Sequence, residues 1–585
     1  MYLEKINSPE DVKKLNIEEL NVLAEEIREG LFNRLTKLGG HCGPNFGFVE
    51  ATIAMHYVFN SPKDKFVFDV SHQTYPHKML TGRKHGYIDD ERMMEISGYS
   101  APDESEHDFF VIGHTSTSVS LACGLAKGRD LNKEKENIIS VIGDGSLSGG
   151  EALEGLDFAG SEIDSNLIII VNDNQQSIAE NHGGLYKNLE ELRNGTAKTN
   201  LFTAFGLDYI YEPEGNNIEK LIKLFNKVKD IDHPIVVHIN TAKGKGYKPA
   251  EQNKENWHWA LPFDRETGHT TIDFGDAEDY TTLTADCILE KMQKDDKVVA
   301  VAAGVPKSFG FTQDRRLKAG KQFIDVGIAE EHAVALISGI AKKGGKPVFG
   351  TNSTFIQRTY DQISQDLCIN NNAGTIVLGY TSVWGLNDVT HLGIFAISVF
   401  SHIPNLLVLA PTNRQEYVSM LNWSVDQNKY PVMLLMPGNG VIKDDRTGVE
   451  DYSDCINKYK IEKKGEKVAI IAVGDFYQIG EQATKMIEEK LGFTPTLINP
   501  RFINDVDKEC LDELKQNHNL VITLEDGIID GGFGEKIANY YGMDKIKVKN
   551  LGLNKEFYDR YDANELLDRL GITPEKITQF VENNI

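Results

Sequence analysis

Two short polar motifs end two apolar runs, and together they predict a site for a metal ion and a phosphate. Gly143-Asp144-Gly145 follows the run 138–142, Asn172-Asp173-Asn174 follows the run 167–171, and Asn174 lies thirty residues after Asp144. Such runs are typical of buried parallel strands, and open α/β sheets bind ligands at the carboxyl ends of these strands. A carboxylate and an amide oxygen are ligands that Mg²⁺ prefers, with phosphate, backbone and water supplying the rest. The two motifs therefore predict a magnesium-bound diphosphate.

Small residues, among them Gly145 and Ser146, lead from this motif into a predicted helix at 151–158. Gly145 has no Cβ, so its backbone can approach a phosphate closely, and the start of the helix offers free N–H groups to an anion. A second segment, Gly113-His114-Thr115-Ser116-Thr117-Ser118, precedes the helical pattern 119–127. Its hydroxyl and N–H groups can cap that helix, hold a phosphate, or do both.

Four histidines lie in Gly-rich or strand-end segments, and loops at strand ends are where α/β proteins build their sites. They are His41, His72, His258 and His391. Each one taken alone has a structural alternative, as an ordinary hydrogen-bonding side chain. As a group, in separate Gly-rich or strand-end segments, they predict a functional site more strongly than any one of them does.

Glu330 opens an apolar helical pattern that continues through Ile340. Taken alone, it is an acidic residue in a first helical turn, where the helix dipole stabilises it. Beside a cofactor, a partly desolvated carboxyl at this position would hold a proton and exchange it with the cofactor. Without the predicted metal site the first interpretation would be preferred, and with that site the second is.

Strand-like apolar runs alternate with helical stretches in three successive blocks, which is the pattern of parallel α/β layers. We therefore expect an α/β fold of three domains with parallel sheets flanked by helices, at 1–264, 280–445 and 460–585, with a linker at 265–279. A helix is expected at 573–583. The expected strands are 66–70, 138–142, 167–171, 235–239, 298–302, 348–350, 376–378, 406–409, 468–473, 496–498 and 520–524.

Size and charge narrow the classes of function. The chain has 585 residues, too many for one core, and a formal net charge of −25. This charge argues against nucleic-acid binding, which needs a basic surface. Two explanations of the acidic excess remain: it keeps the surface soluble, or it favours a divalent cation where the protein binds an anionic diphosphate. The chain has no apolar stretch near 18 residues, no signal-peptide core and no paired cysteines, so we expect a cytoplasmic protein with reduced thiols and no membrane contact.

The two strand-end motifs resemble the signature of thiamin diphosphate enzymes, and nearly the whole chain is similar to the 1-deoxy-D-xylulose-5-phosphate synthase family. Besides the motifs above, the resemblance is carried by His56-Tyr57-Val58-Phe59-Asn60, Ser71-His72-Gln73, Tyr75-Pro76-His77-Lys78, Gly244-Lys245-Gly246-Tyr247, Glu330 with His332, and Ser353-Thr354-Phe355-Ile356-Gln357-Arg358. It implies a transketolase-like fold with two thiamin diphosphate-binding folds and a transketolase C-terminal domain. It also implies a homodimer in which the cofactor spans the first two domains of one protomer.

The same resemblance implies roles for individual residues. It assigns Mg²⁺ to Asp144, Asn174 and the backbone of Gln176. It implies that Glu330 is the carboxyl that activates thiamin diphosphate and that Phe355 stacks on the pyrimidine of the cofactor. The other residues that it implies for cofactor binding are His72, Gly113, His114, Thr115, Gly145, Ser146, Asn174, Ile178 and Tyr247. It also implies that His41, His258 and His391 transfer protons to and from the substrate. Arg358 and Tyr380 are the residues that it implies for substrate binding.

The implied reaction is decarboxylation of pyruvate and addition of the remaining two carbons to an aldehyde, glyceraldehyde 3-phosphate, for isoprenoid biosynthesis. The chain departs from the family where arginines bind the acceptor phosphate: Tyr380 stands in place of one arginine and Gly438 in place of another. Asn352 and Asn387 replace a tyrosine and an aspartate, and the stretch 181–206 is shorter than in the family. These changes predict weaker binding of a phosphorylated acceptor.

Three other functions stay open. A transketolase proper takes a ketose phosphate as donor and releases no CO₂, and a 2-oxo acid dehydrogenase component passes its acyl group to a lipoyl domain. A non-catalytic binding or regulatory homologue would act on neither pyruvate nor a ketose phosphate. Release of CO₂ from pyruvate without a partner protein separates these alternatives from the expected transferase.

Overall fold

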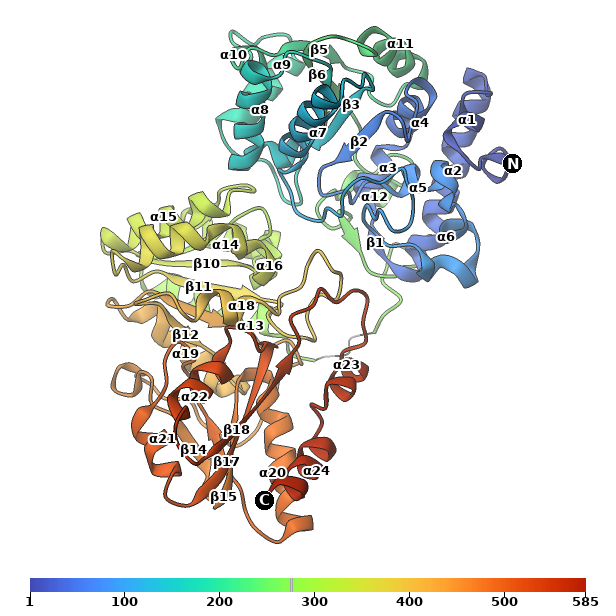
Figure 1. Cartoon of the computed structure of the whole chain (residues 1–585). Helices are drawn as coiled ribbons and strands as arrows, with labels where there is room; N and C mark the ends of the chain where they lie inside the picture. The colour runs from blue at the N-terminus through green and yellow to red at the C-terminus, as the bar shows by residue number, and fades with distance from the viewer. Residues whose placement is uncertain (274, 276) are drawn as a thin grey trace. The chain divides into compact units, whose positions relative to one another are not determined.

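The computed structural model describes residues 1–273, 275 and 277–585; Phe274 and Asp276, in the predicted linker, lie outside the described residues. The chain divides into two compact units, which are defined as unit 1 (Met1–Gly275 with Gly327–Ala329) and unit 2 (Asp276–Val326 with Glu330–Ile585). In Figure 1, blue to green ribbons belong mainly to unit 1, and yellow to red ribbons to unit 2. The three domain boundaries given above stay a prediction.

A parallel sheet of five strands organises unit 1, in the order β2-β3-β4-β6-β5. Four of these strands coincide with predicted ones. The exception is β5, because its Asp-Tyr-Ile-Tyr-Glu sequence contains no apolar run and lies at the sheet edge. The strands are β2 (Lys65–Phe68), β3 (Ile138–Gly143), β4 (Leu167–Asp173), β5 (Asp208–Glu212) and β6 (Pro234–Asn240), and the two-residue strands β1 (Gly40–His41) and β7 (Trp259–Ala260) pair separately.

Helices cover both faces of this sheet. Ile168 and Ile170 of β4 share a core with α2, α4 and α11, whereas Ile169 and Val171 face the core formed with α7 and α8. A strand buried on both faces has no polar alternation, which explains the continuous apolar run of β4. The helices of unit 1 are α1 (Pro9–Val12), α2 (Ile17–Leu38), α3 (Gly43–Gly47), α4 (Val49–Val58), α5 (Tyr75–Lys78), α6 (His85–Ile88), α7 (Ser118–Asn132), α8 (Gly150–Glu162), α9 (Gly184–Arg193), α10 (Leu201–Ala204), α11 (Ile218–Val228) and α12 (Lys248–Gln252).

A chain of buried polar side chains crosses the interior of unit 1. His56 Nε2 and His77 Nδ1 share a hydrogen bond of 2.9 Å, and His77 Nε2 lies 2.9 Å from Asp108 Oδ1. Arg83 binds both carboxylate oxygens of Asp108, at 2.6 and 2.9 Å. Burial is the main cause that lowers the pKa of both histidines, which are therefore neutral in the folded protein.

Acidification below about pH 6.5 is expected to destabilise unit 1. Because the pKa of His56 and His77 is lower in the folded than in the unfolded chain, the unfolded chain binds more protons, and stability falls by about 1.4 kcal/mol per pH unit for each histidine. Urea unfolding at about pH 7.5 and about pH 5.5 measures this loss. His56→Gln should reduce the loss, whereas the exposed His269→Gln should leave it unchanged. An identical acid response in wild type and His56→Gln would contradict this explanation.

Unit 2 contains two sheets, with strand orders β12-β13-β11-β10-β8-β9 and β14-β16-β15-β17-β18. All pairings are parallel except that between β14 and β16. The predicted strands of the second and third blocks are all present. The strands are β8 (Val298–Ala302), β9 (Phe323–Asp325), β10 (Lys346–Asn352), β11 (Thr375–Gly379), β12 (Leu407–Leu409), β13 (Val432–Leu435), β14 (Lys460–Lys463), β15 (Lys467–Ala472), β16 (Thr496–Asn499), β17 (His518–Ile528) and β18 (Lys547–Leu553).

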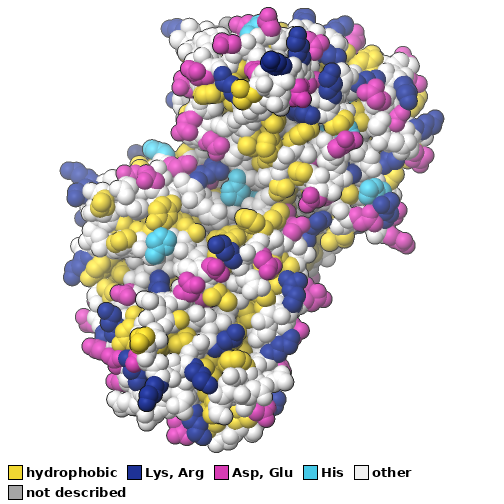
Figure 2. Space-filling view, in the orientation of Figure 1, with side chains coloured by type: hydrophobic (Ala, Val, Ile, Leu, Met, Phe, Trp, Pro, Cys, Tyr) yellow, Lys and Arg dark blue, Asp and Glu magenta, His cyan; other side chains and the backbone are white. Residues whose placement is uncertain are grey.

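Helices of unit 2 pack on these sheets, and α15 covers the β10 sheet with Ala333, Val334 and Ile337. None of the described helices is long and apolar enough to cross a membrane. On the face of the molecule in Figure 2, acidic and basic side chains are interspersed. The helices are α13 (Tyr280–Lys294), α14 (Gln313–Ala319), α15 (Glu330–Lys342), α16 (Ser353–Ile356), α17 (Tyr360–Gln362), α18 (Ala396–Phe400), α19 (Arg414–Asp426), α20 (Tyr477–Leu491), α21 (Lys508–Leu514), α22 (Phe533–Tyr541), α23 (Ala563–Leu570) and α24 (Pro574–Asn584).

Candidate active site

Asp144 and Asn174 come together at the carboxyl edge of the unit 1 sheet. Strands β3 and β4 end in register, with Gly143 opposite Asn172, so the residues that follow them are neighbours. The backbone N–H of Asn174 donates to the Asp144 carboxylate, and Asn181 Nδ2 donates to Asp144 Oδ2 at 2.6 Å. Asn181 was not among the predicted residues, because nothing in its local sequence marks it as a partner of a residue 37 positions away.

The chemistry of this pair fits a divalent cation. Asn174 Oδ1 is buried and accepts no hydrogen bond within the described part of the chain. Burial, and next the charge of Asp173, raises the pKa of Asp144 to about 7, although Lys243 acts in the opposite direction. A cation would satisfy the amide oxygen and stabilise the carboxylate. Across the described residues no three His, Cys, Asp or Glu side chains gather as metal ligands, so a Mg²⁺ ion here would need diphosphate or water oxygens as well.

The neighbouring Asp173 binds the side chains of His238 and Arg193. His238 Nε2 lies 2.9 Å from Asp173 Oδ2, and Arg193 forms an ion pair with the same carboxylate. Although burial opposes it, the contacts with His238 and Arg193 hold the pKa of Asp173 below its ordinary value. Of the two aspartates that the motifs contain, Asp144 is therefore the one whose carboxylate faces Asn174. Gln176 Nε2 donates to Ile178 O at 3.3 Å, which fixes the turn after Asn174.

The segment from Gly113 to Ser118 does not cap helix α7 with its own hydroxyl groups. Asp69 does so instead, since its carboxylate accepts from the backbone N–H of Ser116 at 2.9 Å and of Ser118 at 3.0 Å. Thr117 is the N-cap residue but makes no side-chain cap, and its Oγ1 is buried without a hydrogen bond inside the described residues. The cap of α7 is therefore Asp69, at a strand end, which sequence analysis missed as a capping residue. For the segment that includes His114 and Thr115, phosphate binding remains the prediction.

The turn after Asp144 is tightly packed around Gly145. A Cβ on Gly145 would lie 2.8 Å from Ser177 Cβ, so only glycine fits this turn without a shift. Ser146 accepts from Ser116 Oγ through its backbone oxygen at 2.8 Å, which joins this turn to the Gly113–Ser118 segment. Two segments predicted to hold the diphosphate are therefore in direct contact in unit 1.

Three predicted histidines form one cluster in unit 1. The ring centroids of His41 and His72 lie 4.9 Å apart, those of His41 and His258 5.6 Å, and those of His72 and His258 5.3 Å. His41 is brought there by the antiparallel pairing of β1 with β7, whose first residue directly follows His258. Sequence positions 41, 72 and 258 thus become one group that faces a common space.

Lys243 joins this cluster to the Asp144 motif and was missed by sequence analysis. Its Nζ lies 3.1 Å from His258 Nδ1 and donates to the backbone oxygen of Ser177 at 2.5 Å. Burial lowers the pKa of Lys243 to about 7, against the charge of Asp144. Burial, and next Lys243, also lowers the pKa of His258 well below its ordinary value, so His258 is neutral and can accept a proton.

Tyr247 makes contacts with a backbone oxygen and with aromatic side chains. Its hydroxyl donates to the backbone oxygen of Arg265 at 3.1 Å, and its ring packs against Phe32, Trp257 and Phe263. These contacts give Tyr247 a packing role in unit 1, and its cofactor contact stays a prediction.

In unit 2, Glu330 is the first residue of α15 and is only 3% exposed. Arg358 NH1 lies 3.5 Å from Glu330 Oε2. Burial raises the pKa of Glu330 to about 7, although Arg358 acts in the opposite direction. A carboxyl with this pKa exchanges a proton readily near neutral pH, which the helix-dipole interpretation of Glu330 does not explain.

Phe355 and His391 also meet in unit 2, with ring centroids 5.7 Å apart in an edge-to-face arrangement. Ser353 Oγ donates to Gly393 O at 2.9 Å and ties the segment after β10 to the loop that carries His391. Thr390 Oγ1 lies 2.8 Å from His391 Nδ1 and orients the imidazole. Unit 2 therefore places the predicted stacking residue next to a predicted proton-transfer residue.

Tyr380 and Gly438 lie at the two positions where the resemblance led us to expect arginines. Tyr380 has φ +56° and a side chain that is 41% exposed. The backbone N–H of Gly438 donates to Asp475 Oδ2 at 2.7 Å. The Ser382 hydroxyl lies beside the carboxyl groups of both Asp475 and Asp526, and burial followed by the charge of Asp475 raises the pKa of Asp526 to about 8. Where a phosphate-binding arginine was expected, the chain thus holds a buried pair of carboxyl groups.

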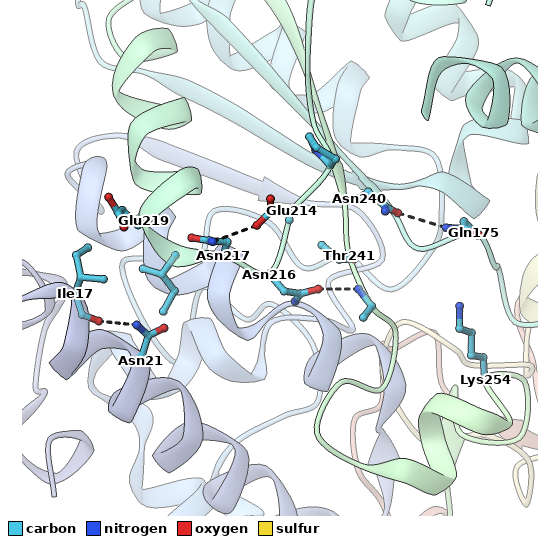
Figure 3. Close-up of a pocket in the computed structure, with 14 residues that line it drawn as sticks. Ile17, Asn21, Gln175, Glu214, Asn216, Asn217, Glu219, Asn240, Thr241 and Lys254 are labelled. Carbon is cyan, nitrogen blue, oxygen red and sulfur yellow. Dashed lines mark hydrogen bonds between the residues drawn. The ribbon is translucent and has the colours of Figure 1, made fainter. Parts of the chain in front are cut away.

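A cavity of about 710 Å³ lies at the same sheet edge in unit 1, next to the ends of β4, β5 and β6 (Figure 3). Gln175, Asn216, Asn240 and Lys254 are among its lining residues, and none of the predicted site residues is. Lys254 Nζ donates to the backbone oxygen of Asn174 at 3.3 Å, so this cavity adjoins the Asp144–Asn174 pair without including it.

Three family models match the chain in succession. The model described as 1-deoxy-D-xylulose-5-phosphate synthase matches residues 3–198 and 189–241. The transketolase pyrimidine binding domain matches residues 276–441, and the transketolase C-terminal domain matches residues 457–577. The chain thus has a transketolase-like fold of α/β layers with parallel sheets.

Relatives extend over the full length. A protein named 1-deoxy-D-xylulose-5-phosphate synthase from Clostridium beijerinckii is 36% identical, covering 99% of this chain and 99% of its own. A protein of the same name from Natranaerobius thermophilus is 35% identical, covering 100% of this chain and 98% of its own. Among solved structures, a transketolase from Campylobacter jejuni covers 97% of this chain and all of its own at 17% identity, with a TM-score of 0.44 that is too low to establish a common arrangement.

Proposed function

Because the chain belongs to the 1-deoxy-D-xylulose-5-phosphate synthase family, we propose that it is a thiamin diphosphate-dependent transferase that decarboxylates pyruvate and joins the remaining two carbons to an aldehyde. The observation that carries this proposal is that Asp144, whose carboxylate accepts from the backbone N–H of Asn174, and the buried, unsatisfied Asn174 Oδ1 both follow directly after the ends of β3 and β4. We further propose that the protein acts as a cytoplasmic homodimer.

The residues of unit 1 would hold the charged end of the cofactor. Asp144, Asn174 and the backbone of Gln176 would bind Mg²⁺, and the turn at Gly145 together with the Gly113–Thr115 segment would bind the diphosphate. Thiamin diphosphate, when bound, would supply the nucleophilic carbon that allows a 2-oxo acid to lose CO₂. The close contact between Ser116 and Ser146 supports a single binding surface formed by both segments.

The protons would be moved by Glu330 and the histidines. Glu330 would hold a proton for the pyrimidine ring, which its burial and its pKa of about 7 support. Neutral His258 would accept a proton from substrate, and His41 and His391 would act in the same way. Phe355 would pack against the pyrimidine.

Purified protein with Mg²⁺, thiamin diphosphate, pyruvate and glyceraldehyde 3-phosphate tests this function. We expect CO₂ release together with 1-deoxyxylulose 5-phosphate, identified by mass spectrometry. Turnover of a ketose phosphate without CO₂ would instead indicate a transketolase. Failure of calorimetry to detect binding of thiamin diphosphate at saturating Mg²⁺ would refute both enzymes and favour a regulatory homologue.

A second candidate differs only in the acceptor, which would be an unphosphorylated aldehyde. The Asp475 carboxyl already accepts from the backbone N–H of Gly438, so an acidic side chain of the chain itself contacts the position where a phosphate-binding arginine was expected. Each charge-assisted hydrogen bond lost with an arginine lowers affinity by about 1.5 to 3 kcal/mol, or roughly ten- to a hundredfold. The carboxyl pair Asp475–Asp526 would further repel a phosphate if ionised.

An acceptor panel is therefore expected to show kcat/KM values for unphosphorylated aldehydes that equal or exceed the value for glyceraldehyde 3-phosphate. Tyr380→Arg, at an exposed position, should raise kcat/KM for the phosphorylated aldehyde by roughly tenfold. Tyr380→Phe serves as the control and should produce no such gain. A strong preference of the wild type for glyceraldehyde 3-phosphate would eliminate this second candidate while leaving the first intact.

A further inference from the structure

The cavity beside the ends of β4, β5 and β6 takes no part in the proposed function, yet it lies where α/β sheets commonly bind ligands. After β4 the chain continues through α9 and α10, which share a core with α7 and α8. After β5 it continues through α11, which packs on the opposite face of the sheet with α2 and α4. Such a change of face at the carboxyl ends of parallel strands leaves a crevice between the connections. The volume of about 710 Å³ is within the range of small-molecule sites.

Three amide side chains reach this cavity from separate segments: Asn21 from α2, Gln175 from the loop after β4, and Asn240 from the end of β6 (Figure 3). Each amide uses one of its two polar atoms within the protein. Asn21 Nδ2 donates to the backbone oxygen of Ile17 at 2.9 Å, and Gln175 Nε2 lies 3.5 Å from Asn240 Oδ1. Within the described part of the chain, no hydrogen bond involves Asn21 Oδ1, Gln175 Oε1 or Asn240 Nδ2. The cavity therefore presents two amide acceptors and one amide donor group to a ligand.

The acidic side chains of the cavity lining disfavour an anionic ligand. Glu214 and Glu219 both line the cavity, and each forms an ion pair with a lysine of α11. The lysine is Lys220 for Glu214 and, at 2.6 Å, Lys223 for Glu219. Carboxylates close to a phosphate or carboxylate ligand would lower its affinity, because like charges repel. Since each carboxylate already has a lysine partner, a cationic ligand would have to compete with that lysine.

The remaining polar group of the lining also suits a hydroxyl. Lys254 Nζ donates to the backbone oxygen of Asn174 at 3.3 Å, and an ammonium group has three N–H donors. A hydroxyl group both donates and accepts, so several hydroxyls on one molecule match a lining that mixes amide acceptors with amide and ammonium donors. Among the described residues that line the cavity none is aromatic, so a flat nucleobase would find no ring to stack on.

We propose that this cavity is a second ligand site, which takes a small uncharged polyhydroxylated molecule through Asn21, Gln175 and Asn240. The site is separate from the residues expected to hold the cofactor, although Gln175 lies between Asn174 and Gln176 in the chain. The inference goes beyond the proposed function and does not rest on it.

Equilibrium dialysis of the cofactor-free full-length protein against radiolabelled xylitol tests the inference. Xylitol is an uncharged polyol without a carbonyl group, so it cannot act as an acceptor. We expect saturable binding of about one xylitol per chain. D-Gluconate, which adds a carboxylate to a similar row of hydroxyls, should bind at least roughly tenfold more weakly, and inorganic phosphate should not displace xylitol. Binding that does not saturate would overturn the site, and tighter binding of gluconate or displacement by phosphate would overturn the uncharged ligand.

Two substitutions locate the bound xylitol. Asn21→Leu and Asn240→Leu should each weaken its binding by roughly three- to tenfold, the effect of one lost hydrogen bond. Asn226→Leu on α11 is the matched control, because Asn226 Nδ2 also donates to the backbone oxygen four residues earlier but Asn226 does not line the cavity. Circular dichroism verifies that each variant is folded. Wild-type affinity in both cavity variants, or an equal loss in Asn226→Leu, would contradict binding in this cavity.

A competition experiment separates this site from the proposed cofactor site. Thiamin diphosphate and Mg²⁺ at saturating concentrations should leave the amount of bound xylitol unchanged. Displacement of xylitol would show that the cavity belongs to the cofactor site and would overturn the inference. If thiamin diphosphate does not bind at all, the proposed function fails, whereas xylitol binding and its loss in the two cavity variants still decide the present inference.

Discussion

Glu330→Gln is expected to lower the rate of CO₂ release from pyruvate by roughly a hundred- to ten-thousandfold, the range that general acid-base catalysis contributes. The amide keeps the shape of the carboxyl and its place at the start of α15, but it cannot exchange a proton with the cofactor ring. The measurement is CO₂ release at saturating Mg²⁺ and thiamin diphosphate, so that weaker cofactor binding does not account for the loss.

Glu331→Gln is the matched control, because it removes a carboxylate one residue away on the same helix. We expect its rate to stay within about threefold of the wild type, because the charge of Glu331 is the weakest of the four influences on the pKa of Glu330. If Glu330→Gln decarboxylated pyruvate at the wild-type rate, the catalytic role of Glu330 would have to be abandoned.

Asp144→Asn should weaken the Mg²⁺-dependent binding of thiamin diphosphate by at least about a hundredfold. Mutating a residue that only supports a metal ligand lowers metal affinity or activity by roughly 10- to 100-fold, and loss of a charged ligand itself should cost more. The variant retains the size of the side chain and changes only its charge. Calorimetric titration with thiamin diphosphate, with and without Mg²⁺, measures the loss.

The stability of the metal-free variant distinguishes lost binding from lost folding. Asp144 is 1% exposed, and an amide in its place removes the unfavourable burial of a charge. Asp144→Asn is therefore expected to unfold at the same temperature as the wild type or a higher one in the absence of metal. Asp157→Asn, on α8 and outside the site, is the control and should bind the cofactor normally. Wild-type affinity in Asp144→Asn would show that the cation is held elsewhere.

Sequence analysis located most of the sheet in each unit because buried parallel strands have an unmistakable apolar pattern. The run 167–171 becomes β4, and its end marks Asn174, because every residue of the strand faces a core. Strands β5 and β18 were not predicted, because they lie at sheet edges and contain polar, partly exposed side chains. An edge position is not the whole reason, because the edge strands β2 and β12 were predicted, whereas the interior strand β13 is short, apolar and buried and was not.

The polar partners of the site were beyond local sequence analysis for a different reason. Asp69 caps a helix 49 positions away, and Arg358 meets Glu330 only after β10 has brought the two segments together. Lys243 could be seen in the sequence, but its burial beside His258 depends on the pairing of β1 with β7. Such long-range contacts follow from the fold, and no spacing rule along the chain encodes them.

The glycine at position 438 restricts how this chain can change further. A Cβ there would lie 2.7 Å from the Cβ of Ser382, whose hydroxyl lies beside both Asp475 and Asp526. An arginine cannot be introduced at this position by a single substitution without displacing Ser382 from its place beside the two acidic groups. Positions 382, 438, 475 and 526 are therefore epistatically coupled, and a larger side chain at position 438 requires compensating substitutions among the other three.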